Sequence, residues 1–230
     1  MSKCQSENSL NFPQARPLLL SLIPAQLTIH NHVVANMNKR IFLISIIGFL
    51  FLTSCNKEKV RVIENDDFKW TITIPKNFKE VSEKNWDKVK SNGIESFEKF
   101  SDQKVKKDDI ENTLFAYKNG PFHTLESNFK IIDTTENYSK SNKELNTVTY
   151  ESLKKAMSNT ELDSLSSKQV ISGMEFDTFE INFDYPNGER LKTKSFRRLF
   201  GNKRFTINIL YKNETIGKEL INSIKNSNFE

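Results

Sequence analysis

The C-terminal half of the chain alternates between apolar and polar residues in a way that predicts a set of antiparallel strands. From residue 179 to 185, every second residue is Phe, Ile, Phe or Tyr, and polar residues lie between them. A period of two with aromatic and β-branched side chains indicates a strand with one buried face. Pro186-Asn187-Gly188 and Gly201-Asn202 are turn signals, so 191–200 and 205–211 are expected as returning strands.

The remainder of the chain predicts more strands and three helices. FKWTITIP alternates before Pro75 stops it, whereas other segments repeat their apolar residues at helical spacing. The expected strands are 68–74, 113–118, 128–133 and 168–172, and the expected helices are 83–100, 147–158 and a last one capped by Asn213. The fold class that buries every apolar face is α+β, a mostly antiparallel sheet flanked by helices.

Three short segments carry a resemblance to a known family. TITIPKNF near the start, ISGMEF before the long meander and YKNETIGKEL before the last helix resemble the PsbP-like family. The resemblance implies an α/β/α sandwich over residues 67–230, with 55–66 as a polar tether before it. Because members of that family are mainly non-enzymatic binding or assembly factors, it also implies such a role. No functional residue of the family maps onto a motif of this chain.

An uncharged apolar run from Ile41 to Thr53 follows Lys39 and Arg40 and ends just before Cys55. It is too short to span a bilayer, and its order of charge, apolar core and small residues is typical of a signal peptide. Leu52-Thr53-Ser54-Cys55 resembles the lipobox of bacterial lipoproteins, which implies cleavage before Cys55 and a diacylglycerol on its thiol. The signal peptide is therefore expected at 37–54, and 1–36 as an over-extended start. An inert cysteine in an uncleaved helix is the alternative.

Lipid on Cys55 would fix where the protein works. Two or three acyl chains, such as palmitate, hold a protein stably on a membrane, so we expect a lipid-anchored envelope protein on the periplasmic or outer-membrane side. From Cys55 onward, 30 Lys and Arg stand against 28 Asp and Glu, a net charge of +2. This near balance predicts no nucleic-acid partner. With one cysteine left, there is no internal disulfide.

The sequence contains no motif for catalysis, a metal or a cofactor. His123 is the sole histidine after Cys55, no G-x-S-x-G or H-E-x-x-H is present, and His123 with Glu126 makes a weak pair. The neighbouring carboxylates Asp66-Asp67 and Asp108-Asp109 are interpreted as loops or caps, because glycosidase acids face each other across a cleft. Trp86 falls on an apolar helical stripe, which favours a core position over a sugar platform.

One segment, residues 190–204, is unusually basic and contains no acid. Its cations are Arg190, Lys192, Lys194, Arg197, Arg198, Lys203 and Arg204. Alternation places Lys192, Lys194 and Arg198 on one strand face, where we expect them exposed, and Arg197 on the other. A solvated strand face is one interpretation. The other is a patch for an anionic partner: lipid headgroups, an acidic glycan or an acidic envelope protein.

These observations predict an envelope lipoprotein with a non-catalytic binding or assembly role. The alternative is an envelope hydrolase with an unrecognised active site. A cleft lined by His123 and carboxylates would favour the hydrolase, and a closed sheet-and-helix body would favour the binding protein. The triplet Asp163-Ser164-Leu165 also resembles an O-glycan acceptor of some envelope proteins.

Overall fold

The computed structural model of the chain describes residues 60–230, apart from 102–103, 107–109 and 134–136. The expected leader and Cys55 lie outside these residues, as do Asp108-Asp109. Within the described part, the elements follow in the order β1 (Arg61–Asn65), β2 (Trp70–Ile74), β3 (Lys79–Glu80), α1 (Glu83–Ser101), β4 (Asn112–Lys118), β5 (Thr124–Ile131), α2 (Tyr138–Ala156), β6 (Glu161–Ile171), β7 (Met174–Asp184), β8 (Arg190–Phe200), β9 (Lys203–Tyr211), α3 (Glu214–Lys225) and β10 (Asn228–Phe229).

Most of the strands form one large antiparallel sheet, in the order β3-β4-β5-β9-β8-β7-β6. The expected meander is present as β6 to β9, and β9 returns to the centre of the sheet beside β5. Gly188 and Gly201 lie at its turns with φ of 80° and 59°, a region that glycine enters without the steric cost of a Cβ. Strands β1, β2 and β10 form a smaller sheet that is not part of the hydrogen-bonded ladder of the large one.

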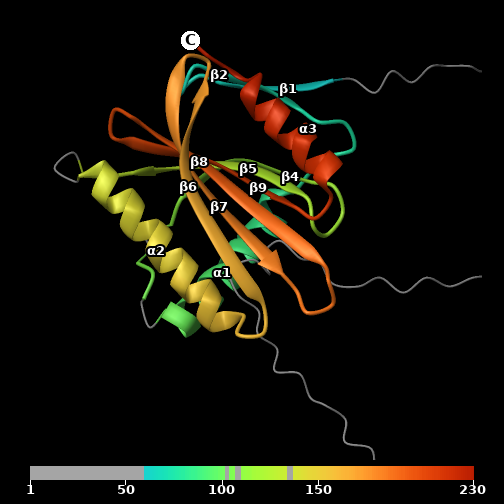
Figure 1. Cartoon of the computed structure of the whole chain (residues 1–230). Coiled ribbons are helices and arrows are strands. Elements are labelled where there is room, and N and C mark those ends of the chain that lie inside the picture. Colours follow the sequence, from blue (N-terminus) through green and yellow to red (C-terminus); the bar gives the residue numbers. More distant parts are fainter. Residues whose placement is uncertain (1–59, 102–103, 107–109, 134–136) are drawn as a thin grey trace, which may run out of the picture.

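One face of the large sheet buries an aromatic core beneath α3 and the small sheet, which lie together on that side (Figure 1). Trp70 on β2 stacks on Phe229 at 5.6 Å between ring centroids and meets Phe205 edge-on at 4.9 Å. Aromatic pairs of this kind add stabilisation beyond the area that they bury. Asn213 caps α3 as predicted, accepting from the backbone N–H groups of Thr215 and Ile216.

Helices α1 and α2 cover the opposite face of the sheet (Figure 1). The C-terminal half of α2 seals its part of that face with an apolar cluster in which Leu153 packs on Phe179, Ile181 and Leu210. Under α1 the sheet is far more polar, as described below. The α+β class, a mostly antiparallel sheet flanked by helices, is thus confirmed.

Several boundaries differ from the expectation, among them the starts of β5 at Thr124 instead of 128 and of β6 at Glu161 instead of 168. The segment 55–66 was expected to be a tether, but Arg61–Asn65 form β1, paired with β2 in register from Arg61–Ile74 to Asn65–Trp70. Helix α2 begins at Tyr138, nine residues before the predicted start at 147, because Asn137 caps it and its first half buries asparagines instead of apolar residues. Polar residues hid both elements from a search for apolar periodicity.

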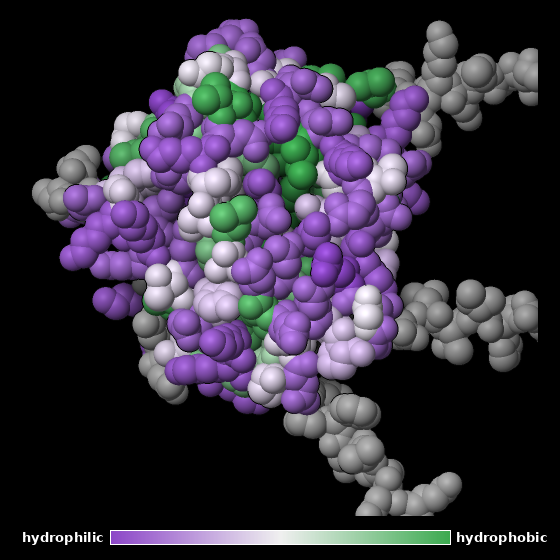
Figure 2. Space-filling view, viewed as in Figure 1, coloured by the Kyte–Doolittle hydropathy of each residue, from purple (hydrophilic) through white to green (hydrophobic). Residues whose placement is uncertain are grey.

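The outer surface is mainly hydrophilic, and the apolar side chains on the face in Figure 2 form small, separate areas. Among the described residues, no helix is long and apolar enough to span a membrane.

Candidate functional site beneath helix α1

A row of polar side chains crosses the centre of the sheet on its helix-covered face. Alternation along β5 turns Leu125 to the aromatic core and Glu126 and Asn128 to the helix side. On β9, Asn208 lies opposite Glu126, and its Nδ2 donates to Glu126 Oε1 at 2.9 Å. Ser195 Oγ on β8 donates in turn to Asn208 Oδ1 at 2.6 Å. Three strands are therefore joined by side-chain hydrogen bonds at a place where apolar contacts are usual.

Helix α1 spans this row and leaves an inner cavity of about 260 Å³, lined by Gly93, Glu126, Asn128 and Asn208. Gly93 is buried on the face of α1 that meets the sheet, and it brings no side chain to fill the space. Trp86, also buried on α1, forms part of the wall. The predicted core position of Trp86 is confirmed, since it is 4% exposed.

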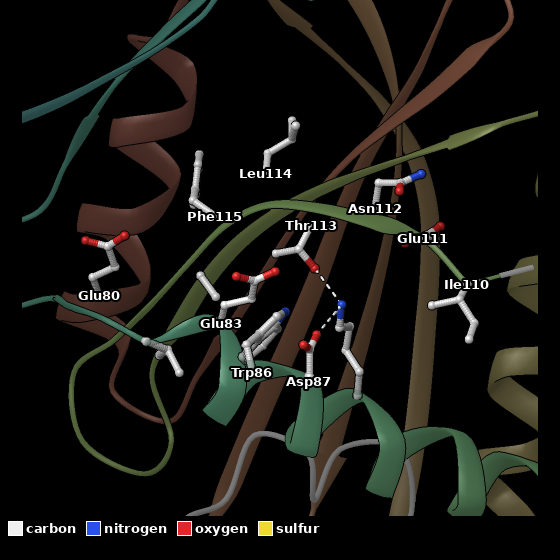
Figure 3. Close-up of a pocket in the computed structure, with 13 residues that line it drawn as sticks. Glu80, Glu83, Trp86, Asp87, Ile110, Glu111, Asn112, Thr113, Leu114 and Phe115 are labelled. Carbon is white, nitrogen blue, oxygen red and sulfur yellow. Dashed lines mark hydrogen bonds and ion pairs between the residues drawn. The ribbon is translucent and has the colours of Figure 1, made fainter. Parts of the chain in front are cut away.

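A wider outer cavity of about 570 Å³ adjoins the inner one and shares Trp86, Lys90, Glu111 and Thr113 with it. Figure 3 shows its acidic border, to which Glu80, Glu83, Asp87 and Glu111 contribute. Lys90 Nζ lies where the two cavities meet, 3.1 Å from Thr113 Oγ1 and 2.9 Å from Asp87 Oδ1, the two dashed contacts in the picture.

Burial raises the pKa of the Glu126 carboxyl to about 7, because a charge withdrawn from water is disfavoured. The hydrogen bond from Asn208 opposes this shift, the negative charge of Glu111 adds to it, and Lys90 and Lys118 oppose it more weakly. Within the described residues, Glu126 forms no ion pair: Lys118 Nζ lies over the Trp86 ring at 5.6 Å, and Lys90 is held by Asp87.

The cavity also contains a buried polar atom without a partner. Asn128 is 7% exposed, and its Oδ1 accepts no hydrogen bond from any residue that the structure describes. On the neighbouring strand β9, Thr206 Oγ1 and Arg204 Nε are also buried without a hydrogen-bond partner among the described residues. Buried polar groups are nearly always hydrogen-bonded, and leaving one unpaired costs about 1–3 kcal/mol. Such a group beside a cavity indicates a place for a polar ligand or for water.

A third cavity, of about 580 Å³, lies under the first half of α2, with Asn142, Asn146, Asp177 and Arg197 in its wall. Arg197 Nη1 donates to Asn142 Oδ1 at 3.1 Å and also to Asn146 Oδ1. Burial lowers the pKa of the Arg197 guanidinium to about 10, so it stays charged at neutral pH. This guanidinium fixes α2 to the sheet.

The basic segment does not form one exposed surface. The face assignment was right, but both faces of β8 and β9 are covered, and Arg197 and Arg204 are buried beneath α1 and α2. Arg204 pairs with Glu111 at 3.2 Å. On the other face, the side chains of Lys192 and Lys194 are 21% and 17% exposed and pair with Glu214 and Glu180.

The other cations of the segment also contact neighbouring residues. Arg198 is half-buried, donates to the Glu175 carbonyl at 2.6 Å and lies over the Phe200 ring. Lys203 pairs with Asp67 at 3.2 Å, and Arg190 pairs with Asp184. The expectation that Lys192, Lys194 and Arg198 are exposed is therefore wrong, because the opposite face of the sheet is also covered by packed elements.

The other singled-out residues lie apart from the polar cavity. His123 Nδ1 donates to the Asn119 carbonyl at 2.9 Å in the turn between β4 and β5, and His123 lines none of the three cavities described. Among the described residues, no group of His, Cys, Asp and Glu is placed to hold a metal ion. Asp163-Ser164-Leu165 lies on β6, an outer strand of the sheet, where Leu165 is exposed.

Comparisons with known proteins find likeness in solved structures alone, since no protein-family model and no curated protein matches the chain. It is similar to the solution structure of cyanobacterial PsbP (CyanoP) from Synechocystis sp. PCC 6803, with TM-score 0.49 and 8% identity over 78% of this chain and 99% of that one. It is also similar to the Ran-binding protein Mog1p of Saccharomyces cerevisiae, with TM-score 0.40 and 8% identity over 74% and 95% of the two chains.

A third similar structure is LpqN of Mycobacterium tuberculosis, described as involved in cell envelope biogenesis. Its TM-score is 0.33 and its identity 9%, over 73% of this chain and 88% of that one. At TM-scores below 0.5 and identities below 10%, none of these likenesses bears on what this chain binds.

Proposed function

We propose that this protein is a lipid-anchored binding protein of a bacterial cell envelope, which holds a small polar ligand beneath α1 and catalyses no reaction. The observation that carries the binding role is the buried, unpaired Asn128 Oδ1 beside the inner cavity. A cavity with a few convergent polar groups among apolar walls is typical of ligand sites.

The anchoring part of the proposal rests on the sequence. The thirteen-residue uncharged run that begins at Ile41 ends within Leu52-Thr53-Ser54-Cys55, and Asn56 begins a polar stretch immediately afterwards. Lipid on the Cys55 thiol supplies a membrane anchor. The protein would then bind its ligand in the cell envelope, on the periplasmic or outer-membrane side.

The hydrolase alternative has no observation in its favour at the cavity. His123, the histidine on which a triad would depend, donates its Nδ1 proton to a backbone carbonyl in a turn. Within the cavity itself, the titratable groups are carboxylates and Lys90. The Thr113 hydroxyl accepts a hydrogen bond from Lys90 Nζ, which also pairs with Asp87, so the lysine donates to this hydroxyl instead of taking a proton from it as a base would.

Native mass spectrometry of the full chain, purified from membranes in detergent, tests the binding role. We expect a small-molecule adduct after exposure to an envelope extract. Gly93→Leu, whose side chain would fill the inner cavity, should abolish the adduct, while Asn92→Leu on the exposed side of α1 should keep it. An adduct that survives Gly93→Leu, or no adduct at all, would overturn this site.

Labelling cells with a radioactive fatty acid tests the anchor separately. The wild-type chain should incorporate label, and Cys55→Ala should remain unlabelled and uncleaved, since the thiol accepts the lipid before cleavage. Lys57→Ala, two residues after Cys55 in the expected mature chain, is the matched control and should label normally. A labelled Cys55→Ala variant would refute the assignment.

A further inference from the structure

We propose that the inner cavity receives the primary ammonium group of a small aliphatic amine, bound between Glu126 and Asn128. This inference deepens the proposed function, on which it rests, by naming the chemical class of the ligand. It follows from the hydrogen-bonding needs of the cavity, its charges and its apolar walls.

The cavity presents acceptors that lack a donor. Asn128 Oδ1 is buried and unpaired, and the Glu126 carboxylate accepts one neutral donor, Asn208 Nδ2. Glu126 and Asn128 are two residues apart on the same strand face, so their Cα atoms are about 7 Å apart. An ammonium group carries three donors and no acceptor, which suits a space between two such oxygens.

The charges around Glu126 compensate its own charge only in part, because Lys90 and Lys118 lower its pKa by less than burial raises it. The groups that face it are Lys118 on β4, Lys90 on α1, Glu111 before β4 and Asn208 on β9. Lys118 lies over the Trp86 ring, Lys90 pairs with Asp87, and Glu111 pairs with Arg204. A ligand that brings a positive charge would restore the ionised form of a carboxyl whose pKa burial has raised to about 7.

Lys90 shows that this part of the protein already holds an ammonium group. Its Nζ is bound by a hydroxyl and a carboxylate, Thr113 Oγ1 and Asp87 Oδ1, at the junction of the two cavities. A ligand that enters from the outer cavity passes the acidic border before it reaches Glu126. That border attracts cations and repels anions.

The remaining walls suit methylene groups. Val89, Ile94, Val105 and Ile110 line the inner cavity together with Trp86, so a short alkyl chain would contact apolar surface behind its charged head. Volumes of about 260 and 570 Å³ fit a flexible diamine that places one ammonium at Glu126 and the other at the outer carboxylates.

Isothermal titration of the full chain in detergent with 1,4-diaminobutane tests the proposal, and 1,4-butanediol serves as the uncharged isostere. We expect saturable binding of the diamine and none of the diol. Glu126→Gln should weaken the diamine at least about tenfold, because hydrogen bonds to charged groups contribute about 1.5–3 kcal/mol. Lys90→Gln should strengthen it, because a competing cation is removed.

Glu95→Gln is the matched control, since it makes the same change of charge at an exposed position of α1 away from the cavities. It should leave binding unchanged. Binding should also weaken about tenfold from pH 8 to pH 6 in the wild type, as Glu126 takes up a proton, and this loss should be absent in Glu126→Gln.

A lysine side chain could present the same group, and Nα-acetyl-lysine-methylamide distinguishes that source from a free diamine. Tighter binding of this compound would assign the site to a lysyl side chain, and tighter binding of the diamine to a free amine. If neither binds, or if Glu126→Gln and Glu95→Gln weaken binding equally, the amine proposal is overturned. The proposed function would still stand if Gly93→Leu removes an adduct from the envelope extract.

Discussion

Asn208 on β9 lies opposite Glu126 on β5 in the strand register, and its side-chain amide donates a 2.9 Å hydrogen bond to the Glu126 carboxylate. This hydrogen bond stabilises the ionised form of the Glu126 carboxyl, whereas burial favours its neutral form. The balance between the two effects raises the pKa of Glu126 from 4.5 to about 7.

This raised pKa makes the stability of the domain depend on pH. The folded state binds a proton more tightly than the unfolded state, so the contribution of Glu126 is fully present below pH 4.5 and is lost as the pH rises through 7. The loss amounts to at most about 3 kcal/mol. Glu126→Gln should therefore stabilise the ligand-free protein at pH 8 and have little effect at pH 4.5.

Urea denaturation of wild type and Glu126→Gln at these two pH values measures the difference. Glu95→Gln, exposed on α1, should follow the wild type at both. Equal destabilisation of Glu126→Gln at both pH values would show that its carboxyl is not held in a raised-pKa environment.

The centre of the aromatic core should not tolerate a charge. Ile207 on β9 is fully buried, and Ile207→Asp would place an unpaired carboxylate among aromatic rings, at a cost of several kcal/mol. We expect the variant to be unfolded or to melt far below the wild type by circular dichroism. The same substitution at Ile131, which is 58% exposed, is the control and should melt close to the wild type.

Arg190 and Arg197 lie on the same strand, β8, but in different environments, and their substitutions should differ in effect on stability. Arg197→Gln removes the donor that Asn142 and Asn146 share, and each buried acceptor left unpaired costs about 1–3 kcal/mol. Arg190→Gln removes an exposed ion pair with Asp184, which contributes about 0–1 kcal/mol. Chemical denaturation should separate the two, and a neutral Arg197→Gln would contradict the anchoring of α2.

Strand β1 should be required for full stability. A chain that starts at Asp66 lacks the five-residue strand paired with β2 and the packing of Ile63 on the aromatic core. With about 2 kcal/mol lost for Ile63, its melting temperature should fall by roughly 4 °C or more relative to a chain that starts at Val60. Equal melting temperatures would mean that β1 contributes little to the free energy of unfolding.

The strands and helices that could be predicted are those in which the buried positions are occupied by apolar residues at regular spacing. Phe179, Ile181 and Phe183 alternate and are buried as expected, and Asn213 caps α3 as its position before an apolar stripe indicates. The start of α2 was missed because Asn142 and Asn146 replace apolar residues there, and their partner, Arg197, is far away in the sequence.

The cavity was missed for a related reason. Glu126 was noted as a neighbour of His123 in sequence, but its place beneath α1 depends on β9 and on the glycine at 93, which local patterns do not connect. A usable signal was present: Glu126 and Asn128 occupy alternate positions of a strand at the centre of the sheet. For the basic segment 190–204 the sequence predicted exposed cations, and the structure covers them. Long cationic side chains that lie across a covered sheet face cannot be told from exposed ones by sequence alone.

The early start of β1 has a consequence for how far the protein can reach. Strand β1 begins six residues after Cys55, and a chain of that length spans at most about 21 Å. A lipid on Cys55 would therefore hold the first strand within about one domain radius of the bilayer surface. The domain would act as a short-range receptor, meeting ligands and partners that come to the membrane instead of searching the space beyond it.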